Sequence, residues 1–211
     1  LRGFVVQIAP KRKNLTRALH ITRALRCPRR GAIMPCMHIY RADLRDLTGC
    51  LQLDASYETE HVWQITQQQE GGQVVTRFQV TKLPRAMQVQ YPGWSEALLA
   101  HQQRGDLILV AAAAMQVYGY IDQETQPDQA LAWIHHLVVA PEHRRQEIGS
   151  ALLARGLQHA RQQAMSQVMT AVQSKNYPAI QFLQKHGFRF SGYNERYYRS
   201  RDIALYFVRG L

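Results

Sequence analysis

The stretch AWIHHLVVAPEHRRQEIGSALLARGLQHA, residues 132–160, decides the fold of this chain. It opens with an apolar run from Trp133 to Val139, whose β-branched and aromatic residues are typical of a buried strand. Pro141 ends that run, and a polar loop follows. From Ile148 onward the apolar residues recur at helical spacing, at Ile148, Leu152, Leu153, Leu157 and Ala160. The stretch predicts a strand, a basic loop and an amphipathic helix in direct succession.

The start of that helix is a predicted anion site. The first N–H groups of a helix have no acceptor inside it, and the helix dipole favours negative charge there. Arg144 and Arg145 add positive charge just before the helix. Many α/β units have this arrangement and bind nothing, so it is a weak indication of function by itself.

Two motifs in the right order make the indication specific. The residues LVVAPEHRRQEIGSALL resemble motif A of the GNAT superfamily of acyl-CoA N-acyltransferases, whose loop reads Arg/Gln-x-x-Gly-x-Gly/Ala and falls here on Arg144 to Gly149. Downstream, Asn176 to Ile180 and Lys185 to Phe188 resemble motif B at the usual distance. The tail GYNERYYRSRDIALYF is similar to the end of the streptothricin acetyltransferase branch. The resemblance extends over residues 36–211.

The resemblance implies an α/β fold of the α+β type, with a mixed, mostly antiparallel central sheet, a splayed central strand and helices on both faces. The pattern of the chain agrees, because hairpins come early and strands alternate with helices late. The predicted strands are Met37–Arg41, Val62–Gln68, Val74–Leu83, Leu107–Ala113, Gln116–Ile121, Trp133–Val139, Gln167–Val172, Phe188–Tyr193 and Ile203–Val208. The first predicted helix follows Asp43, an N-cap, and carries an apolar stripe of Leu44, Leu47, Leu51 and Leu53. The other predicted helices cover Trp94–Arg104, 148–160 and Tyr177–His186. Residues 122–129 are predicted to form a polar loop, and Pro84 and Pro92 a looser passage.

The resemblance also implies how acetyl-CoA would be held. The loop residues Arg144, Arg145, Gln146, Glu147, Ile148, Gly149 and Ser150 would bind the pyrophosphate, mainly through backbone N–H groups. The backbones of Leu137, Val138 and Val139 would pair with pantetheine, and one of their N–H groups would face the thioester oxygen. Asn176 is similar to the family asparagine that meets the pantetheine arm; alternatively, it caps the helix that follows.

Two adjacent histidines are candidates for the general base. Histidine has an ordinary pKa near ~6.5, which suits proton abstraction at neutral pH. Neighbouring strand residues point to opposite faces, so we expect only one of His135 and His136 to enter the cleft. The usual base position in the family favours His135. The alternative is that both histidines are hydrogen-bonded parts of the structure.

Two residues depart from the family pattern. Glu147 stands at the first motif glycine, where a positive φ would cost ~1–2 kcal/mol. Its carboxylate near a phosphate would cost another ~1–4 kcal/mol, partly offset by the two arginines. We therefore expect cofactor binding weakened roughly ten- to a hundredfold. Leu183 stands where the family usually has a tyrosine proton donor, which predicts slower turnover unless Tyr177 or water substitutes.

The formal charge of +11 is concentrated at one end of the chain. Residues 1–33 hold nine Lys or Arg and no acid, which leaves 26 − 9 = 17 basic against 15 acidic residues, a net of +2 for the remainder. We expect residues 1–35 to be a basic, disordered extension and 36–211 the acetyltransferase domain. The extension is a nucleic-acid or membrane arm, a transit peptide, or sequence upstream of a natural start at Met34, which we favour.

The function indicated is transfer of an acetyl group from acetyl-CoA to a primary amine, either of a small molecule such as an amine antibiotic or of a protein. Tyr193, Glu195, Tyr197 and Tyr198 would suit a basic acceptor, or they form a surface turn. The competing hypothesis is a degenerate acetyltransferase fold that acts as an interaction module, and a third is nucleic-acid binding through the extension. We expect no nucleic-acid or membrane partner for the folded domain. The sequence leaves open whether the protein forms a homodimer. Three cysteines at no metal spacing suggest no metal and a reducing, cytoplasmic location.

Overall fold

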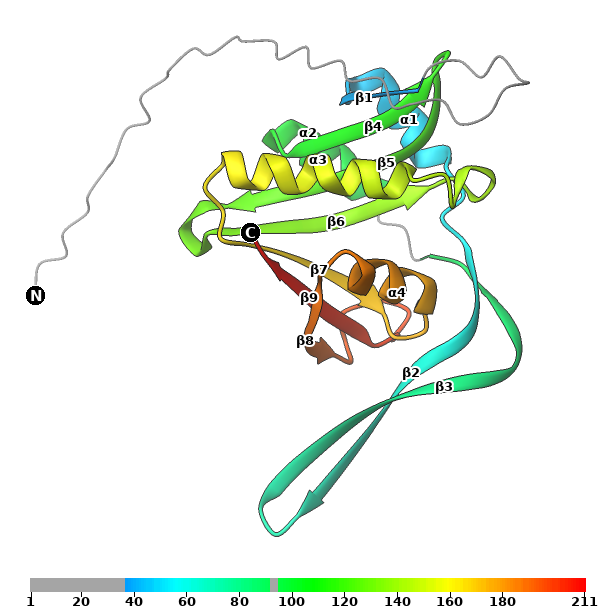
Figure 1. Ribbon diagram of the computed structural model, residues 1–211, viewed down its shortest axis with the longest axis vertical. Helices are drawn as coiled ribbons and strands as arrows, with labels where there is room; N and C mark the ends of the chain where they lie inside the picture. The colour runs from blue at the N-terminus through cyan, green and yellow to red at the C-terminus, as the bar shows by residue number, and fades with distance from the viewer. Residues whose placement is uncertain (1–36, 92–94) are drawn as a thin grey trace, which may run out of the picture.

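The computed structural model describes residues 37–91 and 95–211, which form one seven-stranded sheet, a separate two-stranded sheet and four α-helices (Figure 1). The strands are β1 (His38–Arg41), β2 (Tyr57–Glu70), β3 (Gln73–Val89), β4 (Leu107–Ala113), β5 (Gln116–Gln126), β6 (Leu131–Val139), β7 (Gln167–Gln173), β8 (Arg189–Asn194) and β9 (Ala204–Gly210). The helices are α1 (Leu44–Gln52), α2 (Ser95–Arg104), α3 (Ile148–Gln162) and α4 (Tyr177–Lys185). The predicted extension at residues 1–35, and Pro92 and Trp94, lie outside the described residues.

The large sheet has the order β1-β4-β5-β6-β7-β9-β8. Its neighbouring strands pair antiparallel except β6 and β7, which are parallel and are connected through α3. A parallel pair needs such a crossover, and the amphipathic stretch after Pro141 supplies it. The predicted mixed, mostly antiparallel sheet is confirmed.

Helices cover both faces of this sheet, as predicted. Alternate residues of β4 explain why, since Ala111 and Ala113 pack with α3 and α4 in one core, whereas Val110 and Ala112 pack with α1 and α2 in a second core. Side chains of one strand alternate between faces, so a strand that is apolar throughout needs a cover on each side. The sheet is therefore the middle layer of three.

The strands β6 and β7 pair over four residues only and then part. Leu131 to Ile134 are in register with Gln167 to Thr170, and no pair continues beyond them. The Thr170 hydroxyl donates to the Ile134 carbonyl at 3.0 Å, at the last pair before the strands part. From His135 onward, β6 keeps its antiparallel partner β5 but exposes its other edge. The predicted splayed central strand is confirmed.

Three predictions about elements were wrong in instructive ways. β5 runs on to Gln126, so the expected polar loop at 122–129 is mostly strand, and Asp122 and Gln123 are fully buried. On α1, the capping box at Asp43 is present and Leu47 is buried as predicted, but Leu44 and Leu51 are 67% and 47% exposed and the second buried residue is Cys50. β3 continues past Pro84 because the register shifts there, and a proline is tolerated at such an irregularity.

The hairpin of β2 and β3, called the arm below, projects away from the main sheet (Figure 1). Its root is tied to the body by a backbone hydrogen bond of 2.8 Å from the Trp63 N–H to the Ser174 carbonyl. The Trp63 and Phe78 rings pack against Phe190 of β8. Toward its tip the arm exposes Val74 and Val75. The root therefore belongs to the body, and the tip reaches into solvent.

Candidate active site

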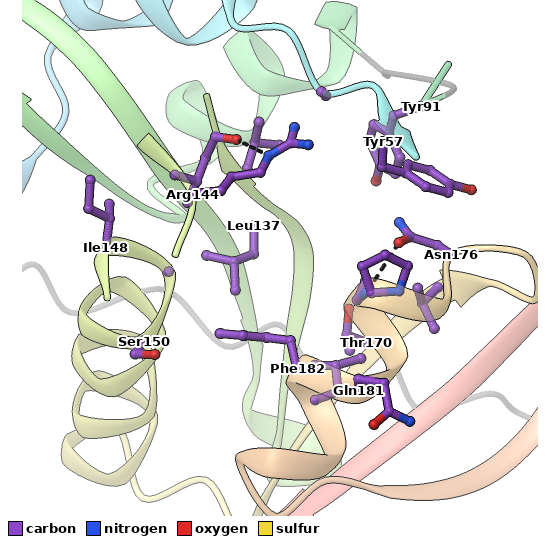
Figure 2. A pocket seen from close by; sticks show the side chains of 18 of the residues that line it. Tyr57, Tyr91, Leu137, Arg144, Ile148, Ser150, Thr170, Asn176, Gln181 and Phe182 are labelled. Atoms are coloured by element: carbon purple, nitrogen blue, oxygen red, sulfur yellow. Dashed lines mark hydrogen bonds between the residues drawn. The ribbon is translucent and has the colours of Figure 1, made fainter. Parts of the chain in front are cut away.

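A cleft of about 660 Å³ opens where β6 and β7 part. Its walls come from both strands, the start of α3 and one side of α4, and Figure 2 shows Leu137, Thr170 and Phe182 converging on it. At its far end lie Tyr57, the first residue of β2, and Tyr91, which follows the end of β3. The cleft thus connects the start of a helix with an aromatic mouth, along the open edge of a strand.

The start of α3 offers a row of free backbone donors. Within the described part of the chain, the N–H groups from Arg145 to Ser150 have no hydrogen-bond acceptor. Arg145 and Glu147 have φ angles of 62° and 60°, which turn successive amides toward the same side. Such a concave row of amides at a helix N-terminus is an anion site.

Glu147 adopts the predicted left-handed conformation and caps α3 without using its side chain. The side chain is exposed, so the turn is not plugged by its own carboxylate. Nearby, the Ser150 hydroxyl and His186 Nε2 lie 3.1 Å apart, which joins the first turn of α3 to the end of α4. The turn therefore stays open to an anion, although it carries a negative charge at its rim.

The loop arginines have different roles. Arg144 donates from Nε to the Val139 carbonyl at 2.9 Å (Figure 2). Its Nη2 donates to the Asp54 carbonyl at 3.3 Å. It lines the cleft but is committed to holding the loop against β6. Arg145 is exposed, and Gln146 donates to the Glu142 carbonyl. Of these side chains, Arg145 is the one placed to meet a phosphate.

The open edge of β6 distinguishes the three residues expected to pair with pantetheine. Backbone groups alternate between the two edges of a strand. The Val138 carbonyl lies against Gly119 of β5, and the Ala140 N–H bonds to Tyr118 of the same strand. Leu137 and Val139 therefore direct their backbone groups to the open edge, where Arg144 already occupies the Val139 carbonyl. Val138 lines the cleft but does not offer backbone hydrogen bonds to it.

The two histidines lie at a β-bulge. Asp122 pairs with His136, and Gln123 pairs with Ile134, so His135 is the extra residue of β6. Both rings lie near His101 of α2, with centroid distances of 4.4 Å for His135 and 6.5 Å for His136. Of the two, His135 lines the cleft and His136 does not. The expectation that the two side chains point to opposite faces was wrong, because both rings lie near His101 on the α2 side of the bulge.

A carboxylate stands beside each histidine. His135 Nε2 lies 3.0 Å from Glu124 Oε2, and His101 Nδ1 lies 2.6 Å from Asp122 Oδ2. His136 Nδ1 is 3.4 Å from the same Asp122 oxygen, without the alignment of a hydrogen bond. His136 is buried and does not line the cleft, so its interpretation as a structural histidine fits better.

The surroundings shift the pKa values of this group. Burial lowers the pKa of the His135 imidazole, and the hydrogen bond to Glu124 opposes this only in part. Burial would raise the pKa of the Glu124 carboxyl, but the hydrogen bonds from His135 and Gln126 and the positive charges nearby together outweigh burial, and the pKa falls. Asp122 behaves alike, since the neighbouring His136 and His101 lower its pKa against burial. His135 is therefore neutral and the carboxylates are charged at neutral pH.

The aromatic mouth is held by a chain of hydrogen bonds. The Tyr57 hydroxyl donates to Gln173 Oε1 at 2.9 Å, Gln173 Nε2 donates to Asp202 at 2.7 Å, and Asp202 pairs with Lys175 at 2.7 Å. Glu58 also lines the cleft here. The cluster expected to hold the acceptor (Tyr193, Glu195, Tyr197 and Tyr198) does not line the cleft; Tyr193 contacts the arm and Tyr198 is buried.

The remaining predicted residues are placed as follows. Asn176 Oδ1 accepts from the Ala179 N–H at 3.1 Å, so the residue caps α4, and it also lines the cleft (Figure 2). Leu183 lines the cleft without any hydroxyl to donate. Sequence reasoning missed His101, Asp122 and Glu124, although alternating polar residues in an otherwise apolar hairpin were a usable signal.

Acetyl-CoA fits these features. Its diphosphate needs donors of the kind found free from Arg145 to Ser150, and its peptide-like arm needs an unpaired strand edge such as that at Leu137. The described residues contain no group of three or more His, Cys, Asp or Glu suited to a metal ion, and no described helix is long and apolar enough to cross a membrane. Fold and cleft together define an acyltransferase that uses a nucleotide thioester.

Comparison with known proteins agrees. The pattern of the Acetyltransferase (GNAT) family matches residues 75–188, and the chain belongs to this family of acetyl-CoA-dependent N-acetyltransferases. It is 32% identical over 111 residues to N-acetyltransferase 8 of Homo sapiens. That alignment spans 50% of this chain and 48% of the curated relative, about half the length of each.

Two solved structures share the fold. Nourseothricin acetyltransferase has a TM-score of 0.71 and 20% identity, over 82% of this chain and 98% of the other. A Bacillus anthracis protein classed as a streptothricin acetyltransferase, crystallised with acetyl coenzyme A, has a TM-score of 0.68 and 19% identity, over 83% and 99% of the two chains. The likeness to the streptothricin acetyltransferase branch inferred from the tail is thus found again in the fold.

Proposed function

We propose that this protein transfers the acetyl group of acetyl-CoA directly to a primary amine, without a covalent intermediate on the enzyme. The observation that carries the proposal is the cleft itself, which connects free amides at the start of α3 with the His135 ring along the open edge of β6. Acetyl-CoA would supply a thioester carbonyl open to attack by a neutral amine. The residues of the chain would bind acetyl-CoA, orient the two substrates and remove the proton from the amine.

The binding role is assigned mainly to the backbone. Amides from Arg145 to Ser150, with the Arg145 side chain, would hold the diphosphate. Leu137 would pair with the pantetheine arm, and its N–H is the candidate donor to the thioester oxygen. Arg144 would act indirectly, because it keeps the loop in place through Val139 and Asp54.

The base is assigned to His135. An alkyl ammonium group has an ordinary pKa near ~10, so a proton must leave before attack. His135 is the titratable ring of the pair that lines the cleft, and burial keeps it neutral. A base within hydrogen-bond distance of the attacking nitrogen increases the rate by roughly 10²–10⁴-fold.

The acceptor is proposed to be a cationic small molecule. Tyr57 and Tyr91 lie at the end of the cleft away from the phosphate loop, and Glu58, which follows Tyr57 in β2, also lines the cleft. A carboxylate with aromatic faces suits a basic amine. The two solved structures named above are called a nourseothricin and a streptothricin acetyltransferase, which makes these compounds, together with polyamines, the first to assay.

The test is a thiol-release assay with acetyl-CoA and a panel of amines. We expect turnover in the wild type, a loss of about 10²–10⁴-fold in kcat for His135→Ala, and little change in the KM for acetyl-CoA. His136→Gln is the control for general disruption of the bulge. Absence of turnover with every amine, or equal rates in the wild type and His135→Ala, would refute the assignment.

A second candidate is a degenerate member that binds the cofactor weakly. The observation in its favour is the Glu147 carboxylate at the rim of the anion site. A thermal shift with CoA separates the two cases. No shift in the wild type, together with a clear shift in Glu147→Gly, would support the degenerate fold.

A further inference from the structure

The carboxylate of Glu124 is not explained by binding of the cofactor or the acceptor. It does not line the cleft, its side chain is 28% exposed, and it lies 3.0 Å from Nε2 of His135, whose side chain is 23% exposed. Glu124 therefore lies between the imidazole and solvent.

The pairing determines which nitrogen of His135 can act. An ionised carboxylate only accepts hydrogen bonds, so Nε2 must carry the hydrogen. The neutral ring then has its lone pair on Nδ1. In the described part of the chain Nδ1 has no hydrogen-bond partner, and His135 is one of the residues that line the cleft. Nδ1 is therefore the atom available to an incoming amine.

The other charged groups around the ring are few and can be named. The ring of His101 of α2 contacts that of His135, tilted by 40° and with a centroid distance of 4.4 Å, and His101 is itself paired with Asp122 of β5. His136 follows on β6 and faces the same Asp122 oxygen. Arg104 of α2 acts on Glu124 from a distance. Of these groups, Glu124 is the one that makes a hydrogen bond to the His135 ring.

We propose that Glu124 is the positioning residue of the reaction, which fixes the Nε2–H tautomer of His135 and stabilises the imidazolium that forms when Nδ1 takes a proton from the amine. This inference rests on the proposed function. In the proton transfer, an N–H bond of the substrate ammonium breaks and a bond from hydrogen to Nδ1 forms. The Nε2–H group stays bonded to Glu124, and the Nδ1 proton leaves to water after the products leave the cleft, which restores the neutral Nε2–H ring. No electrons are gained or lost.

The proposal goes beyond a base acting alone, because a cleft filled by cofactor and acceptor leaves little water to stabilise an imidazolium. The Glu124 carboxylate supplies that stabilisation from within the protein, on the ring nitrogen that does not meet the amine.

The test compares Glu124→Gln with Asp128→Asn. Gln keeps the shape and can still accept a hydrogen bond but has no charge, whereas Asp128 is an exposed acid in the same β5–β6 connection and serves as the matched control. We expect Glu124→Gln to lower kcat about tenfold and Glu124→Ala about a hundredfold, with the KM for acetyl-CoA and the melting temperature nearly unchanged. Asp128→Asn should behave like the wild type.

Two readouts separate positioning from a merely structural role. The charge of Glu124 raises the pKa of His135, so its removal should move the acid limb of kcat/KM to lower pH. Nitrogen-15 NMR of the histidine rings, with His135→Gln for assignment, should show the Nε2–H tautomer in the wild type and a mixture in Glu124→Ala. An unmoved limb and an unchanged tautomer would overturn the proposal even if activity fell.

The same experiment distinguishes failure of this inference from failure of the proposed function. Wild-type turnover with no effect of Glu124→Gln would leave the transferase standing and remove Glu124 from it. No turnover with any amine would refute the function, and the NMR titration of His135 alone would then decide whether Glu124 controls the ring.

Discussion

At the scale of single residues, Glu147 combines two unfavourable features at one position. Its left-handed backbone costs about 1–2 kcal/mol in a residue with a side chain. Its carboxylate at the rim of an anion site adds about 1 kcal/mol of repulsion toward a phosphate in a solvent-exposed setting. Both effects can be measured separately, because different substitutions remove them.

We predict that Glu147→Gln tightens acetyl-CoA binding about fivefold without changing stability, since it removes only the charge. Glu147→Gly should tighten binding similarly and also raise the melting temperature by about 2–4 °C through relief of backbone strain. Titration calorimetry and thermal melts measure the two effects. Unchanged affinity in both variants would show that the carboxylate points away from the bound phosphate.

A second prediction at this scale concerns pH. Burial lowers the pKa of His135, and a base must be unprotonated to act. The rate should therefore fall only when the pH drops below the ordinary histidine pKa of about 6.5. The acid limb of kcat/KM, measured at saturating acetyl-CoA, is expected below that value. A limb above pH about 7 would mean that another group is the base.

At the scale of elements, helix α3 packs so closely on β5 that a side chain added at one glycine would force its neighbours to shift. A Cβ added to Gly156 would lie 2.8 Å from Gln123 Oε1 and 2.9 Å from Ile121 Cδ1. The Gln123 amide also donates to the Gly156 carbonyl at 3.3 Å. The close approach lets α3 cover the strand beside β6, and so positions the start of the helix at the cleft.

We predict that Gly156→Ala destabilises the protein by about 1–3 kcal/mol in urea denaturation, because the added methyl group overpacks the contact. Helix propensity alone would predict a gain of about 1 kcal/mol. Ala154, an exposed residue on the same helix, provides the control, and Ala154→Gly should lose about 1 kcal/mol. Stabilisation by Gly156→Ala would contradict the observed packing.

Patterns in the sequence predicted the elements well where local periodicity and burial agree, as in β6, α3 and α4. They failed where polar residues satisfy one another across the fold. Asp122 was assigned to a loop because no local pattern shows that it would pair with His101, which lies on helix α2. The bulge at His135 was also invisible, since it follows from the register between two strands. The motif loop, by contrast, was found because its chemistry depends on consecutive backbone amides.

At the scale of the whole molecule, the arm divides into an attached root and a free tip. At the root, Phe78 packs on Phe190 with ring centroids 4.6 Å apart. Near the tip, Val74 and Val75 are 59% and 39% exposed, and neither lines the cleft. The two parts should therefore respond differently to change.

We predict that the arm can be shortened by deleting two facing pairs, Gln68 with Val75 and Gln69 with Val74. This deletion should leave the turn and the strand register intact. The melting temperature should change by no more than about 2 °C, and acetyl-CoA affinity should not change. Phe78→Ala, in contrast, should cost about 3 kcal/mol. Loss of acetyl transfer, with cofactor binding retained in the shortened variant, would show that the tip contacts the acceptor.

The Trp63 side chain has a practical consequence. Its indole is packed among Phe78, Phe190 and Phe207, where the root of the arm meets the body. Indole emission depends on the polarity around the ring, so the molecule contains a natural optical probe of arm docking. A shift of that emission to longer wavelength, while circular dichroism stays constant, would report release of the arm from the body as a step separate from unfolding.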